Sequence, residues 1–280
     1  MTQAKDPASI KQLIEQTFNS IAESYDCPEM RYFRYAADYM INLSKIPPGS
    51  RVCDVAAGTG MVTIAAAKQV RSSDGLGRVQ AIDFSEAMLK KAERNIQKYA
   101  LENVDMHVMD AEKLEFRSDY FDLICCGFGI FFLPAPEKAI EKWQRILKPG
   151  GQIIFSTFAD SAFMPMARWF KEDVESLGVE YPDKGWQPFS KEEDCLALLD
   201  AERFKKQTIT RKQHGIHLKD EHEWWRIISS SGYRAILDML KPEQQAKLQD
   251  IHSKRVAELK NDQGVWVDVD VIYTQGWKRC

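Results

Sequence analysis

The feature that most constrains the fold of this chain is a change of pattern after Pro47-Pro48-Gly49. From there the sequence alternates short apolar runs with helical segments, which is the pattern of a parallel sheet built from βαβ units. Five strands are predicted in this part of the chain, at 51–55, 78–82, 104–109, 121–127 and 151–157. Helices are predicted between them near 60–70, 85–99 and 135–147.

The segments on either side complete one domain over residues 1–280. Two helices are predicted before the sheet, the first beginning at Asp6-Pro7 because proline suits the first position of a helix. After Thr157 come further helices, a sixth strand near 206–216 and a seventh strand near 265–271, where valines alternate with polar residues and Trp266.

Composition excludes several classes of protein. The 38 Lys and Arg residues are balanced by 41 Asp and Glu, and no lysine-rich block provides the positive stripe that follows a phosphate backbone, so no nucleic-acid partner is expected. The longest apolar run, Leu123 to Leu133, has 11 residues, too few to span a membrane. The six cysteines form no Cys-x-x-Cys pair and no His stands at ligand spacing, so neither a metal site nor disulfides are expected, and a cytoplasmic setting follows.

Val52 to Gly60 places an apolar strand, a glycine-rich turn and a helix start in succession. In an open α/β sheet, the crevice at the carboxyl end of the first strand is where a nucleotide-like ligand binds. Glycine lets the backbone turn tightly and lets a ligand approach without meeting a Cβ atom. The alternative interpretation is a turn with a structural role only.

Three acidic residues lie at the ends of consecutive predicted strands. Asp54 ends the first, and Asp83 follows the second at a distance of 23 residues from Gly60, where a carboxylate accepts both ribose hydroxyls. Asp110 ends the third, where a carboxylate can accept the exocyclic amine of adenine. Each acid alone could simply cap a helix, but the three together indicate a nucleoside site.

Residues 15–158 resemble the class I S-adenosylmethionine-dependent methyltransferases, in the branch related to the ubiquinone/menaquinone C-methyltransferases. The motifs that carry the resemblance are Phe18 to Asp26, Asp54 to Gly60, Ala81 to Ser85, Met109 to Glu112 and Leu147 to Gly151. The resemblance implies an α/β fold, a Rossmann-like, doubly wound and mostly parallel sheet of seven strands with an antiparallel final strand. It also implies S-adenosylmethionine as the cofactor and a small molecule as the methyl acceptor.

The same resemblance assigns the cofactor contacts. Gly58 and Gly60 would pass beneath the methionine part, Asp54 would orient the site and Asp83 would hold the ribose. The remaining contacts are Asp110 with Ala111 at the adenine amine, Phe84 and Met88 beside the adenine ring, the main chain of Cys126 and Gly127 at the methionine ammonium, and Tyr25 at its other end. Packing within the helices is the alternative role for Tyr25.

Two departures from the family pattern concern the pocket. Ala56 stands where many relatives have glycine, which narrows the pocket slightly. Phe128-Gly129-Ile130 continues with Phe131-Phe132, where the quinone enzymes usually have Arg-Asn, so the quinone substrate is not carried over.

The long segment between Ile216 and Val265 is predicted to include two helices, opened by the capping-box pattern of Asp220 and Glu223. Because loops over the carboxyl edge of a sheet carry specificity, 159–189 and 219–262 are predicted to cover the acceptor. The chain is thus divided into N-terminal helices at 1–45, a cofactor-binding core at 46–158 and these two insertions.

The insertions are rich in aromatic residues, which suit an aromatic or otherwise apolar acceptor. Trp224 and Trp225, together with Phe128, are the predicted acceptor contacts, and helix packing is the alternative role. A base is needed only if the acceptor must lose a proton. His217 is the candidate, ahead of His214 and His222, and a structural role is the alternative for each.

Two other functions compete. An NAD-dependent oxidoreductase also needs a glycine turn and a ribose-binding acid, but Thr63 occupies the third glycine position of Gly-x-Gly-x-x-Gly. A non-catalytic protein could keep the cofactor site and use the lid helices to bind a protein. The sequence leaves open whether the chain is a monomer or a homodimer.

Overall fold

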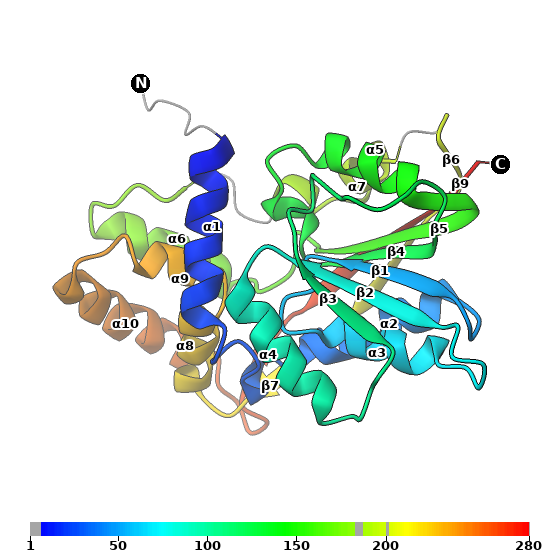
Figure 1. Ribbon diagram of the computed structural model, residues 1–280. Helices are drawn as coiled ribbons and strands as arrows, with labels where there is room; N and C mark the ends of the chain where they lie inside the picture. Colours follow the sequence, from blue (N-terminus) through cyan, green and yellow to red (C-terminus); the bar gives the residue numbers. More distant parts are fainter. Residues whose placement is uncertain (1–6, 183–186, 200–201, 280) are drawn as a thin grey trace.

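The computed structural model describes residues 7–182, 187–199 and 202–279. Its central feature is a seven-stranded sheet in the order β3-β2-β1-β4-β5-β9-β6 (Figure 1). In that order the strands are Val104–Val108, Arg78–Asp83, Arg51–Val55, Phe121–Gly127, Leu147–Phe158, Asp270–Lys278 and Phe204–Gln213. The pairs from β3 to β5 are parallel, whereas β9 runs antiparallel to both of its neighbours. The predicted mostly parallel sheet with an antiparallel final strand is confirmed.

The register of the parallel strands gathers their carboxyl ends at one edge. Val55 of β1 pairs with Ile82 of β2, and Asp83 pairs with Val108 of β3. The strand order reverses between β1 and β4, and such a switch point opens a crevice at the carboxyl ends. The predicted strand-end acids therefore meet at this edge.

Helices cover both faces of the sheet, as Figure 1 shows. One face carries α2 (Tyr32–Ser44), α3 (Met61–Val70) and α4 (Glu86–Gln97), and the other carries α5 (Pro136–Ile146) and α7 (Glu192–Ala197). Successive strand residues point to opposite faces. Accordingly Val52 belongs to the apolar cluster with α2 and α3, while Cys53 belongs to the cluster with α5. This two-sided burial confirms the doubly wound arrangement.

Outside these layers, helix α1 (Pro7–Ile21) stands between the sheet and a group of helices that we call the lid helices (Figure 1). The lid helices are α6 (Met166–Ser176), α8 (Glu221–Ser230), α9 (Arg234–Leu237) and α10 (Pro242–Ala257). Three short 3-10 helices, η1 (Pro28–Met30), η2 (Ile130–Phe132) and η3 (Gln187–Phe189), lie in connecting segments. Asp220 caps α8 by accepting the main-chain N–H groups of His222 and Glu223 at 3.1 Å each, as predicted.

A buried hydrogen-bonded chain ties the lid helices together. The indole N–H of Trp224 on α8 donates to Nε2 of His252 on α10 at 2.9 Å. The other ring nitrogen, Nδ1, therefore carries the proton and donates to Asp173 on α6 at 2.8 Å. Burial lowers the pKa of His252, which keeps the ring neutral. These three residues fix the lid helices as one packed unit.

Two predicted strands are each broken in two. The strand predicted at 206–216 ends at Gln213 and resumes as β7 (Ile216–Leu218), while the strand predicted at 265–271 divides into β8 (Val265–Val267) and β9. Strands β7 and β8 pair with each other in a separate two-stranded sheet. At the break, a Cβ atom on Gly215 would lie 2.3 Å from the Trp266 ring, so only glycine fits there. The predicted alternation of buried valines still holds.

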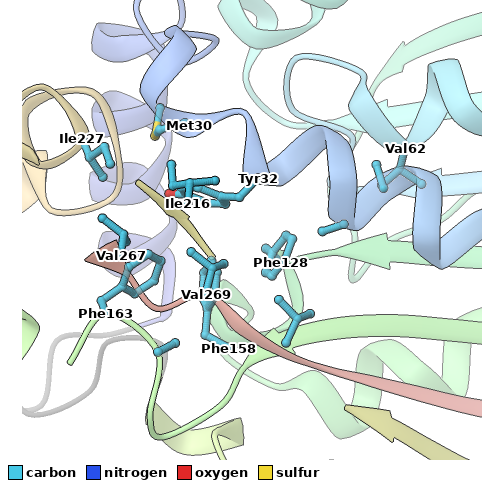
Figure 2. Packing of buried hydrophobic residues seen from close by; sticks show 14 of the residues in the cluster. Met30, Tyr32, Val62, Phe128, Phe158, Phe163, Ile216, Ile227, Val267 and Val269 are labelled. Carbon is cyan, nitrogen blue, oxygen red and sulfur yellow. The ribbon is translucent and has the colours of Figure 1, made fainter. Parts of the chain in front are cut away.

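The main apolar core runs from the sheet into the lid helices. Figure 2 shows Phe128 and Phe158 near the sheet, with Phe163, Val267 and Ile227 following on the side of the small sheet and α8. No helix among the described residues is long and apolar enough to span a membrane.

Candidate active site

A cleft lies at the carboxyl edge of the sheet and encloses about 1110 Å³ of unfilled space, its open mouth included. Its lining comes from helices α1 and α2 and from the segments that follow β1, β2, β3 and β4. No residue of the lid helices is among the lining residues that the structure describes. The cleft is thus built by the sheet edge and the two N-terminal helices.

The glycine turn after β1 forms the floor of this cleft. The main-chain N–H of Ala57 donates to Ile82 at 2.9 Å, and that of Gly60 donates to Ala57 at 2.9 Å. Gly58 has a φ of +54°, and a Cβ atom there would meet nothing within 4 Å. Since Gly58 lines the cleft, that open space is room for a ligand.

Gly60, the second glycine of the turn, packs closely against α4, and its predicted cofactor contact stays a prediction. Its φ is +87°, and a Cβ atom there would lie 3.2 Å from Cβ of Ala92 on α4. Gly60 is absent from the described lining of the cleft, so its small size serves helix packing. Ala56 lines the cleft with a φ of +57°, and its methyl group is accommodated because Gly129 faces it, where a Cβ atom would lie 2.6 Å away.

Asp83 lies at the centre of the floor and is 6% exposed. Its Oδ2 accepts the N–H of Gly58 at 2.8 Å, and its Oδ1 accepts the N–H of Ser85 at 2.8 Å. Burial raises the pKa of Asp83, and these two hydrogen bonds oppose that shift. The bonds fix the carboxylate plane, and each oxygen keeps a lone pair with which it can accept a ribose hydroxyl.

Asp54 lies at the end of β1 and is fully buried. Its carboxylate accepts the hydroxyl of Thr63 at 2.5 Å and the thiol of Cys125 at 3.8 Å. Burial raises the pKa of Asp54 to about 7, and the nearby charge of Asp83 adds to the shift. Because Asp54 lines the cleft, a positively charged ligand group there would restore its ionised form.

The third acid, Asp110, is held by a residue that sequence reasoning missed. Lys11 of α1 donates to Oδ2 of Asp110 at 2.7 Å and also pairs with Glu112. Although burial acts in the opposite direction, this pairing lowers the pKa of Asp110. Beside it, the carbonyl of Ala111 accepts the indole N–H of Trp143 at 2.8 Å. Nothing in the sequence indicated that α1 would bring a lysine to this acid.

The other predicted cofactor contacts also reach the cleft, with one exception. The residues that line it are Tyr25, Phe84, Met88, Ala111 and Gly127. Tyr25 stacks on Phe33 with ring centroids 5.4 Å apart, and burial raises the pKa of its hydroxyl. Cys126 is 1% exposed, and its side chain packs in the cluster with α5, so only its main chain remains a candidate contact.

The predicted catalytic histidine and tryptophans do not reach the cleft. His217 lies on β7 with its ring 4.8 Å from that of Trp266, and Trp224 is 1% exposed within the lid helices. Trp225 is half-buried against the main core. Local sequence patterns had placed these residues near the sheet edge, but β7 pairs with β8 outside the main sheet, and α8 packs with the other lid helices (Figure 1).

Of the three predicted acceptor contacts, Phe128 alone lines the cleft. Sequence reasoning missed the stripe of α2 that faces it, which consists of Phe33, Ala36, Ala37 and Met40. These residues are spaced three, one and three positions apart, which places them on one face of a helix. This apolar helical spacing is the sequence signal that could have identified them.

The chain matches the model of the ubiE/COQ5 methyltransferase family over residues 1–176. The chain belongs to that family. Its cofactor is S-adenosylmethionine, and the open space at Gly58 and the acids at the three strand ends fit that molecule.

Relatives and solved structures agree with this family. The chain is 31% identical over 183 residues to a ubiquinone/menaquinone biosynthesis C-methyltransferase of Pseudomonas putida (strain GB-1), covering 58% of this chain and 70% of that one. It is 28% identical to the aklanonic acid methyltransferase of Streptomyces sp. (strain C5), covering 65% of this chain and 82% of the other. A putative methyltransferase from Bacillus halodurans shares the fold, with a TM-score of 0.56, 18% identity and coverage of 88% and 100%. Two other ubiquinone/menaquinone C-methyltransferases, of Hydrogenovibrio crunogenus and Ectopseudomonas mendocina, are covered to only 58% of their length.

Proposed function

We propose that this methyltransferase transfers the methyl group of S-adenosylmethionine to a flat, apolar small molecule. The observation that carries the proposal is an aromatic wall beside Asp54 and Gly58. Phe128 stacks on Phe158 with centroids 4.4 Å apart and planes inclined by 23°, and Phe33 meets Phe128 edge-on at 5.2 Å. Phe33 and Phe128 line the cleft. Flat rings pack well against such a wall.

The wall is held rigidly, which supports a role in orientation. Phe128 has a φ of +55°, a conformation that costs energy for a residue other than glycine. Its N–H donates to both the carbonyl and the hydroxyl oxygen of Ser156 on β5, each at 3.2 Å. Those bonds keep the strained backbone in place, and Phe128 is thereby aimed at the cleft.

S-adenosylmethionine supplies an electrophilic methyl group on a positively charged sulfur. The protein's own part is to hold two molecules in line and to exclude water, which supplies most of the rate in such a transfer. Gly58 and Asp83 bind the nucleoside part, and the wall of Phe33 and Phe128 orients the acceptor. Names of relatives support this acceptor class, since aklanonic acid methyltransferase and the ubiquinone/menaquinone C-methyltransferases are named for small organic molecules.

The lid helices act in this proposal through α1 rather than by touching the acceptor. Residues Lys11, Ile14 and Phe18 of α1 line the cleft, and α1 also contacts α9. Next to α1, Phe132 meets the ring of Phe18 with centroids 5.1 Å apart, and a Cβ atom on Gly232, in the segment between α8 and α9, would lie 3.6 Å from the ring of Phe132. The insertions predicted at 159–189 and 219–262 would therefore support α1, which covers the cleft, and would not cover the acceptor themselves. Residues 183–186 of the first insertion lie outside the described part of the chain.

The proposal includes a cytoplasmic site of action and no macromolecular substrate. All five cysteines in the described part of the chain are free thiols, as a reducing compartment allows.

The experiment has two parts. Melting temperature is measured with S-adenosylmethionine, S-adenosylhomocysteine and NAD, and only the first two should raise it, because ligands that bind the native state stabilise it. Phenols, carboxylic acids and 1,3-dicarbonyl compounds are then incubated with methyl-labelled S-adenosylmethionine and the products are weighed by mass spectrometry. Stabilisation by NAD alone, or no labelled product from any acceptor, would refute the proposal.

A further inference from the structure

The cleft holds few groups that could take a proton from an acceptor. Its described lining residues with ionisable side chains are Lys11, Tyr25, Asp54, Asp83 and Asp110. Lys11 is already protonated and paired with two carboxylates, whose hydrogen bonds raise its pKa against the effect of burial. Burial keeps the hydroxyl of Tyr25 protonated. Neither group can act as a base near neutral pH.

The three carboxylates are committed to other work. Asp110 is held in its ion pair with Lys11, and both oxygens of Asp83 accept main-chain N–H groups at 2.8 Å. Asp54 lines the cleft and accepts the hydroxyl of Thr63, and a positively charged cofactor beside it would return its pKa from about 7 toward the ordinary acidic range, where a carboxylate is a weak base.

All five histidines of the chain are described, and all lie outside the cleft. Their surroundings are the amide of Gln80 for His107, the hydroxyl of Tyr273 for His214, the ring of Trp266 for His217, the exposed surface of α8 for His222 and Asp173 for His252. Histidine, the most common general base in enzymes, is thus missing from the described lining of the cleft.

We infer that the acceptor enters the cleft as an anion whose nucleophilic oxygen or carbon has already lost its proton. This rests on the proposed methyl transfer and narrows its substrate class to acidic aromatic compounds, such as a carboxylate or the enolate of a 1,3-dicarbonyl. A lone pair of the anion forms the bond to the methyl carbon, the carbon–sulfur bond breaks, and its electron pair stays on sulfur. The two opposite charges cancel, and no proton is transferred.

The described cleft offers such an anion little attraction of its own. Lys11 is its single described cation, and both Asp110 and Glu112 occupy it. The acceptor's charge must therefore be balanced by the sulfonium of the cofactor. Phe33, Phe128 and Met40 present apolar side chains to the cleft, and beside apolar surfaces such an attraction is stronger than in bulk water.

This arrangement makes anion affinity depend on the charge of the bound cofactor. The test uses two analogues: sinefungin, which carries an amine cation in place of the sulfonium, and S-adenosylhomocysteine, which is neutral at sulfur. The probes are 1-naphthoate and its uncharged match 1-naphthamide, and dissociation constants are measured by calorimetry on the full chain at pH 7.5. Naphthoate should bind the sinefungin complex at least about 10-fold more tightly than the S-adenosylhomocysteine complex. The dissociation constants of naphthamide for the two complexes should differ by less than about 2-fold.

Equal affinities of naphthoate for the two complexes overturn the inference, and so does absence of naphthoate binding to the sinefungin complex. Failure of both analogues to bind the protein would instead refute the proposed cofactor site, so the two failures are distinguishable.

A second measurement uses acceptors that the labelling experiment identifies. At saturating S-adenosylmethionine, so that the titration of Asp54 does not enter, the midpoint of the pH profile of kcat/KM for the acceptor should move with the pKa of each acceptor. His217→Ala should leave that midpoint unchanged. A midpoint that stays at one pH for acceptors of different pKa would show a base on the protein and overturn the inference.

Discussion

The buried carboxyl group of Asp54 should make cofactor binding depend on pH. Burial raises its pKa to about 7, because burial removes the carboxylate from water, and the hydrogen bond from Thr63 opposes this shift only in part while the nearby charge of Asp83 adds to it. S-adenosylhomocysteine carries an ammonium group, and a cation in the cleft should return the pKa toward the ordinary acidic range. Binding should therefore release a proton wherever Asp54 is protonated beforehand.

The magnitude follows from the pKa shift. If Asp54 stays ionised in the complex, the dissociation constant increases by the factor 1 + 10^(pKa − pH). Relative to pH 8, binding is then about 10-fold weaker at pH 6 and about 100-fold weaker at pH 5. Asp83, whose pKa burial also raises, would add in the same direction. The Asp110 carboxyl does not titrate in this range, because Lys11 lowers its pKa despite the opposing effect of burial.

Calorimetry in two buffers of different ionisation enthalpy measures both the affinity and the number of protons released. We expect release of about one half of a proton at pH 7 and nearly one at pH 6. The control is Asp54→Asn, which should bind more weakly at pH 8 and lose most of the dependence. A dissociation constant that is flat from pH 5 to 8, with no proton release in the native protein, would show that the charge of Asp54 is not used.

Three further changes test the site and the lid. Asp83→Ala should weaken S-adenosylhomocysteine binding by about 2–4 kcal/mol, since hydrogen bonds to a charged acceptor are lost, and unchanged calorimetric affinity would exclude its contact with the ribose. Gly58→Val should abolish S-adenosylhomocysteine binding, because the valine side chain would project into the open cleft. Gly60→Val should mainly lower the melting temperature, because its side chain would press on Ala92. Normal binding by Gly58→Val together with lost binding by Gly60→Val would contradict these roles. Trp224→Ala should cost about 3–5 kcal/mol of unfolding free energy because the side chain is buried, and denaturant titration showing little loss would contradict its structural role.

Local patterns were sufficient to predict which strand-end residues gather at the cleft. Asp54, Asp83 and Asp110 each lie at or just after the end of a strand that the apolar pattern already indicated, and parallel pairing brings strand ends together without further information. Gly58 was likewise recognisable from its place between a strand and a helix. For these residues, position along the chain determined position in space.

The rest of the cleft and the placement of the lid helices depended on contacts between distant segments. Lys11 meets Asp110 across 99 positions of sequence, and Trp224 is turned inward by His252 and Asp173. The break at Gly215, where the Trp266 ring leaves no room for a Cβ atom, directs β7 and His217 away from the cleft. Apolar spacing predicts that a helix has a buried face, but the partner of that face depends on the packing of all the helices together. Only the tertiary structure therefore decided which aromatic residues line the cleft.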